Sequence, residues 1–109
     1  MFRISMLYRA DEAIRFDGSY YRDHHVPLVA ERIGDLCESW EVDFGVATGE
    51  VSPPFLAVGH FHTRDLDGFL AALQRNRAEL EADLDNCSSH APQMQISKVA
   101  ASSSRRAPE

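Results

Sequence analysis

Histidine and tyrosine side chains stand close together in the first third of the chain. Tyr21 and His25 are four residues apart, so on a helix they share a face and can touch. Pro27 lacks a backbone N–H and would free the carbonyl of Asp23 to hold the His25 ring. A neutral imidazole fixed in one tautomer is suited to general acid–base chemistry. Tyr20 or Tyr21 could donate a hydrogen bond to an enolate or phenolate oxygen.

The same residues also have an architectural interpretation. His25 and the two tyrosines could pack the helix on a sheet, with the imidazole bonded to a backbone carbonyl and taking no part in chemistry. Both interpretations stay open at this point. The substitution His25→Gln separates them, because only an acid–base role makes turnover depend on the ring.

A second pair of histidines, His60 and His62, alternates along a predicted strand and so points to one face of the sheet. Two histidines are the minimum from which a metal site can be built. No carboxylate or cysteine stands at matching spacing, so we predict no metal. We predict instead that both rings bind substrate in an enclosed interior, with ordinary surface positions as the alternative.

Two aromatic residues, Trp40 and Phe44, share one face of another predicted strand. We predict that they bind substrate as the walls of a pocket for an aromatic molecule. Places in the core or in a dimer interface explain them equally well.

The composition is that of one ordinary globular domain. The chain has 109 residues, of which 44% are hydrophobic and 26% charged, with a net charge of −6. No basic face emerges for nucleic acid, and the apolar runs are shorter than the ~20 residues of a membrane span. Cys37 and Cys87 are isolated, which predicts free thiols and a cytoplasmic protein. No phosphate loop or dinucleotide fingerprint is present, so we predict no cofactor.

Hydrophobic periodicity predicts four strands and two helices. Period-two alternation predicts strands over residues 2–9, 38–46, 55–62 and 94–99. One helix should begin at the N-cap Asp17 and stop at Gly34, with a kink or a fresh start at Pro27. The other should run from the N-cap Asp65 to Asn86. In it, Arg77 and the acidic residues would be turned outward, and residues 79–85 would form a solvated acidic end.

The resulting order, βαββαβ, predicts an α+β ferredoxin-like domain over residues 1–100. Its four-stranded antiparallel sheet would carry both helices on one face, with the strand 55–62 near the centre. A second copy would cover the other face, which predicts a homodimer. Residues 101–109 are predicted to form a disordered tail.

The segment from Phe16 to Leu28 resembles the signature of the EthD family. That signature is Phe-Asp, two residues, Tyr-Tyr, three residues and His-x-Pro-Leu, and the sequence FDGSYYRDHHVPL fills every fixed position, with its histidine at His25. The family usually has an aromatic residue and a serine near positions 63 to 65, where this chain has Thr63 and Asp65. Aspartate also caps helices, so the departure leaves the fold unaffected.

The resemblance implies a dimeric α/β barrel, in which two sheets close around a shared interior. Relatives with this architecture include cofactor-independent monooxygenases, polyketide cyclases and muconolactone isomerases. It therefore implies an enzyme that isomerises, cyclises or oxygenates a small hydrophobic aromatic, lactone or polyketide-like compound through His25. Two alternatives stay open: a non-catalytic accessory protein that binds such a ligand in the barrel, and a haem-associated protein with an axial histidine.

Overall fold

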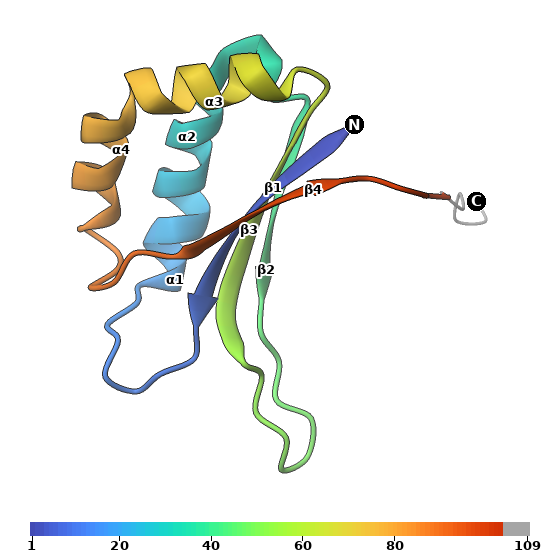
Figure 1. The fold of residues 1–109 in the computed structure, drawn as a ribbon. Helices are drawn as coiled ribbons and strands as arrows, with labels where there is room; N and C mark the ends of the chain where they lie inside the picture. Colours follow the sequence, from blue (N-terminus) through green and yellow to red (C-terminus); the bar gives the residue numbers. More distant parts are fainter. Residues whose placement is uncertain (104–109) are drawn as a thin grey trace, which may run out of the picture.

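The computed structural model describes residues 1–103 and consists of one sheet with helices packed on one of its faces (Figure 1). The strands are β1 (Phe2–Arg9), β2 (Ser39–Phe44), β3 (Phe55–Thr63) and β4 (Gln93–Lys98). All neighbouring strands are antiparallel, in the order β2-β3-β1-β4. The predicted α+β ferredoxin-like fold is thereby confirmed. Residues 104–109 of the predicted disordered tail lie outside the described residues.

The central strands bury every second side chain against the helices. Ile4 of β1 stands opposite Phe61 of β3, and Tyr8 stands opposite Ala57; each of these four residues is at most 4% exposed. Strand side chains alternate between faces, so the intervening residues point to the open face of the sheet. The central position predicted for β3 is confirmed, because β3 pairs with both β1 and β2.

The first helical region is continuous but changes its winding. It comprises α1 (Gly18–Tyr20), a π-helical turn (Tyr21–His25), α2 (Val26–Ile33) and a short 3₁₀ turn (Gly34–Leu36). As predicted, the Asp17 side chain caps the beginning by accepting the Tyr20 N–H at 3.1 Å, and Gly34 ends α2 with a φ of 74°.

The irregularity predicted at Pro27 takes the form of a widened turn just before it. The Val26 N–H bonds to the Tyr21 carbonyl, five residues back rather than four. Pro27 has no N–H to contribute to a regular ladder. Wide turns of this kind occur frequently at functional sites.

The prediction of one helix over residues 65–86 is wrong, because α3 (Leu66–Arg75) and α4 (Arg77–Leu84) are separate helices. Asn76 leaves helical geometry between them, with a ψ of 8°, and its side-chain amide donates to the Ala72 carbonyl at 2.8 Å. The predicted cap by Asp65 is present, accepting the Gly68 N–H at 2.9 Å. In Figure 1, α4 turns sharply away from α3 and runs beside α2.

The core lies between the sheet and the helices. Its fully buried apolar side chains include Ile4 of β1, Phe61 of β3, Val26 of α2 and Phe69 of α3. Cys37 and Cys87 are free thiols, as predicted, and burial raises the pKa of Cys87 to about 11. Over residues 1–103, every helix is too short or too polar to span a lipid bilayer.

Candidate functional site

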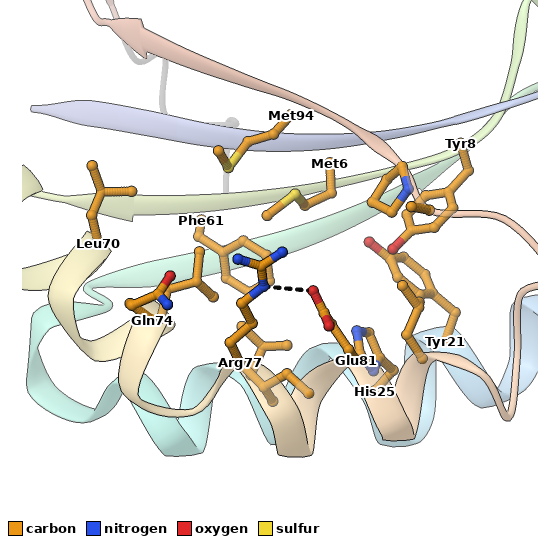
Figure 2. Close-up of a pocket in the computed structure, with 16 residues that line it drawn as sticks. Met6, Tyr8, Tyr21, His25, Phe61, Leu70, Gln74, Arg77, Glu81 and Met94 are labelled. Atoms are coloured by element: carbon orange, nitrogen blue, oxygen red, sulfur yellow. Dashed lines mark hydrogen bonds and ion pairs between the residues drawn. The ribbon is translucent and has the colours of Figure 1, made fainter.

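A cavity of about 530 Å³ lies between the helices and the β1–β4 side of the sheet, and it is open to solvent on one side. Apolar side chains form most of its wall. The sheet contributes Met6, Phe61 and Met94, while the helices contribute residues that include Leu70, Leu73 and Leu80 (Figure 2). This volume and lining are typical of sites for small organic ligands.

His25 lines this cavity and is held by a carboxylate from another helix. Its Nδ1 lies 2.9 Å from Oδ2 of Asp83 on α4, and the two side chains are 8% and 17% exposed. Burial alone would raise the pKa of Asp83, but hydrogen bonds from Tyr20 and His25 outweigh it and lower that pKa. An ionised carboxylate only accepts hydrogen bonds, so Nδ1 of His25 is the donor in this pair.

The other ring nitrogen of His25, Nε2, is available to a ligand. Within residues 1–103, every buried side-chain nitrogen or oxygen has a hydrogen-bond partner, and the bond to Asp83 uses only Nδ1. Nε2 has no protein partner there, so it is accessible, and the ring borders the cavity. An imidazole with Nδ1–H fixed and Nε2 accessible can accept a proton.

Tyr20 supports this arrangement from outside the cavity. Its hydroxyl donates to Oδ1 of Asp83 at 2.6 Å and accepts a hydrogen bond from the Asn86 side-chain amide at 3.2 Å. Asp83 therefore receives Tyr20 on one oxygen and His25 on the other. The sequence placed Tyr20 next to the substrate, whereas in the fold it contacts the carboxylate behind His25.

Two buried phenols lie beside His25. The Tyr21 ring stacks on the imidazole at 5.7 Å between centroids, and Tyr8 meets Tyr21 edge-on at 4.9 Å. Both rings line the cavity, and their hydroxyls face each other (Figure 2). Burial raises the pKa of both phenols, so they stay protonated and can donate hydrogen bonds.

Tyr21 reaches the sheet because β3 has a glycine under its hydroxyl. A Cβ at Gly59 would collide with the Tyr21 hydroxyl. The glycine thus gives room for the phenol at the inner end of the cavity.

His60 and His62 lie on the open face of the sheet, away from this cavity. His60 has Nδ1 at 2.8 Å from the Ser5 hydroxyl and Nε2 at 3.1 Å from Asp43. His62 accepts from Arg3 at 3.1 Å and pairs with the Ser39 hydroxyl at 3.1 Å. Each ring therefore has both nitrogens occupied. No cluster of three or more potential metal ligands exists among the residues with described positions.

Trp40 and Phe44 of β2 point to the helix side of the sheet but lie at its far edge. They are 41% and 42% exposed, and neither lines the cavity. Phe44 packs near Gly18 at the start of the first helix. The fold thus brings together His25, Tyr21 and Tyr20, and it leaves the four other predicted site residues elsewhere.

The fold of this chain is similar to that of solved structures, whereas its sequence alone finds no match among family models or curated proteins. Among solved structures, an EthD-like protein from Ralstonia eutropha JMP134 is similar, with 33% sequence identity, a TM-score of 0.89 and 96% of both chains covered. The chain belongs to the EthD-like family.

Two more distant structures share the fold of this EthD-like protein. An ethyl tert-butyl ether D (EthD) family protein from Bacillus halodurans C-125 has 16% identity and a TM-score of 0.67, with 90% of this chain and 97% of that chain covered. HapK from Hahella chejuensis has 13% identity and a TM-score of 0.63, with 98% and 100% covered.

Some residues of the EthD-like signature stabilise the fold, and others form the site. Phe16 packs on Tyr8 and Tyr21, at 5.0 and 5.3 Å between ring centroids, and Asp17 caps the helix. Among the other fixed positions, Tyr20 and His25 bond to Asp83, and Tyr21 stacks on the His25 ring. The partner predicted for His25, the backbone carbonyl of Asp23, is corrected to the Asp83 carboxylate.

Two residues of the site, Asp83 and Arg77, were not predicted as site residues from this EthD-like sequence. Both were predicted to point outward into solvent. For Asp83 the prediction is wrong, because its side chain is only 17% exposed and contacts His25. Arg77 is exposed as predicted, at 64%, but it also lines the cavity. A signal existed in the spacing. Within α4, Arg77 stands three residues before the buried Leu80 and Asp83 stands three residues after it, so both lie beside the apolar face of this helix.

Proposed function

We propose that this EthD-like protein is an enzyme that transfers a proton to and from a hydrophobic small molecule bound in the cavity. The observation that carries the proposal is the imidazole of His25, fixed through Nδ1 by Asp83 and open at Nε2. A histidine that only packed the helix would need neither a buried carboxylate partner nor an accessible nitrogen.

The proposed step begins with a carbon acid, such as a CH group next to a ketone. The proton moves to Nε2 of His25, and the C–H electron pair becomes an enolate whose oxygen accepts a hydrogen bond from Tyr21. The ring becomes an imidazolium, which the Asp83 carboxylate stabilises. Return of the proton to another carbon completes an isomerisation. In a cyclisation, the enolate attacks a carbonyl of the same molecule and the resulting alkoxide takes the proton back from the imidazolium. In an oxygenation, the carbanion reduces dioxygen, taken up as a co-substrate, and the resulting peroxide takes that proton.

The test uses 2-tetralone, a bicyclic ketone with acidic CH₂ protons, as a probe. Hydrogen–deuterium exchange in D₂O is followed by NMR with and without the protein. We expect wild type to accelerate exchange and His25→Gln to lose about 100-fold of that acceleration. The matched control is His24→Gln, which removes the exposed neighbouring imidazole and should exchange like wild type.

Two outcomes would count against the proposal. Equal exchange by His25→Gln and wild type would assign the acceleration to other groups. Binding of the ketone without any acceleration would favour the alternative, an accessory protein that only carries a hydrophobic ligand in this apolar cavity.

We also propose that two copies pair through the open face of the sheet. In this face, Leu7 of β1 stands opposite Val58 of β3, and both are only partly covered within residues 1–103. Burial of such apolar groups between two sheets favours a symmetric dimer. Light scattering should give twice the monomer mass, and Val58→Glu should halve it, whereas Val46→Glu on the exposed β2–β3 hairpin should not. A monomeric wild type would contradict this pairing.

A further inference from the structure

The outer part of the cavity has charged side chains that the proton-transfer step does not use. Gln74 of α3, and Arg77 and Glu81 of α4, line the cavity together with His25. Figure 2 shows the Arg77 guanidinium and the Glu81 carboxylate on the cavity side of α4, joined by a hydrogen bond from Nε at 2.7 Å. Among the described lining residues, Arg77 is the only permanently cationic one.

The ion pair that engages Arg77 is weak enough to be exchanged. Its two side chains are 64% and 63% exposed and lie four residues apart on one helix. Solvent-exposed pairs of this kind are screened by water and contribute little. Glu81 can rotate into solvent, because its helix position is exposed.

Arg77 is placed to serve the cavity rather than the surface alone. It stands three residues before Leu80 and seven before Leu84 on α4, so the three side chains share one face of this helix, and all three line the cavity. Its Nε already donates a hydrogen bond to one carboxylate, that of Glu81. Guanidinium groups bind carboxylates in planar, bidentate geometry, and the Gln74 amide can donate a further hydrogen bond.

We propose that Arg77 and Gln74 bind the carboxylate of a hydrophobic acid whose apolar body extends along the cavity towards His25. This inference rests on the proposed function and names the substrate class for the same site. The ligand carboxylate replaces that of Glu81 on the guanidinium, and the leucine-rich wall covers the apolar body. The acid group therefore sets the orientation in which a reacting carbon meets Nε2.

The test compares 2-naphthylacetate with 2-naphthylacetamide, which has the same shape and no charge. By titration calorimetry at pH 7.5 and low salt, wild type should bind the acid about tenfold more tightly than the amide. Arg77→Gln should abolish this preference and keep the affinity for the amide, which also reports a folded cavity. Glu81→Gln should strengthen binding of the acid about threefold by freeing Arg77.

The matched control is Arg75→Gln, which removes an equal charge two residues away, at an exposed position that does not line the cavity. It should keep the preference for the acid. The proposal is overturned if wild type binds both probes equally, if it binds neither, or if Arg75→Gln loses as much preference as Arg77→Gln.

These outcomes are separable from a failure of the proton-transfer proposal. The 2-tetralone probe is neutral and does not require Arg77. Preference for the acid with no exchange of 2-tetralone would reject the His25 chemistry alone. Exchange of 2-tetralone with no preference for the acid would reject the carboxylate anchor alone.

Discussion

Two histidine–aspartate pairs stand on opposite sides of one sheet. On the helix side, His25 meets Asp83 at 2.9 Å, with side chains 8% and 17% exposed. On the open side, His60 meets Asp43 at 3.1 Å, with side chains 18% and 61% exposed. Within residues 1–103, the second ring nitrogen of His25 has no hydrogen-bond partner, whereas the Ser5 hydroxyl pairs with the second nitrogen of His60. The same two residue types thus form a pair whose histidine borders the cavity in one place, where we propose that it transfers a proton, and a surface network in the other.

The largest expected effect contrasts two neighbouring residues of β3 that point to opposite sides. Phe61 is 2% exposed in the core, so Phe61→Ala should lower the free energy of unfolding by ~3–5 kcal/mol through lost burial and a residual cavity. His60→Ala removes hydrogen bonds to Ser5 and Asp43 and should cost ~1–2 kcal/mol. Urea unfolding of both variants measures the difference.

Equal losses for the two β3 variants would contradict this ranking. They would mean that the open face is covered as completely as the helix side. Repeating the measurement at several protein concentrations would then show whether a second copy supplies that cover, because dimer stability rises with concentration.

The next effect compares the two aspartates. Asp83→Asn removes the charge that fixes the His25 tautomer and should reduce the acceleration of 2-tetralone exchange ~100-fold, while binding of the ketone is retained. Asp43→Asn makes the matched change on the open face and should leave exchange as in wild type. If both variants lost activity alike, the difference between the two pairs would have no catalytic meaning.

The smallest effect is a pH dependence of stability. The pKa of Asp83 is lowered in the fold, relative to ~3.9 in an unfolded chain. Its carboxylate therefore stabilises the protein above about pH 4, and this contribution disappears as the pH falls through the folded-state pKa. Urea unfolding between pH 6 and 3 should give a flatter profile for Asp83→Asn than for wild type. Parallel profiles would disprove the contribution, and Tyr20→Phe, which removes one donor, should fall between the two.

Much of the fold follows from local patterns. The caps at Asp17 and Asp65, the stop at Gly34 and the central position of β3 all depend on residues near one another in sequence, and the structure contains each of them. The signature around His25 likewise placed Tyr21 beside the imidazole, because helical spacing determines which side chains meet.

The parts that failed depend on contacts between distant segments. The break at Asn76 redirects α4, so helical periodicity counted from Leu73 no longer tells where Arg77 and Asp83 point. Asp83 stands in a run of similar acidic residues, and only the packing of α4 beside the π-helical turn selects it as the partner of His25. The cavity forms only through that packing. The sequence therefore could not show that Trp40 and Phe44 lie outside it, and their aromatic types alone suggested a place in its wall.

The π-helical turn at Tyr21–His25 differs from a regular helical turn by a single inserted residue, and this has an evolutionary consequence. A turn closed five residues back holds one residue more than a regular helical turn, while the flanking helices keep their own register. A single codon therefore separates this helix from an uninterrupted α-helix. The segments that carry the cap at Asp17 and the packing of Leu28 can stay in place through that change, so the spacing between Tyr21 and His25 can evolve without a new fold.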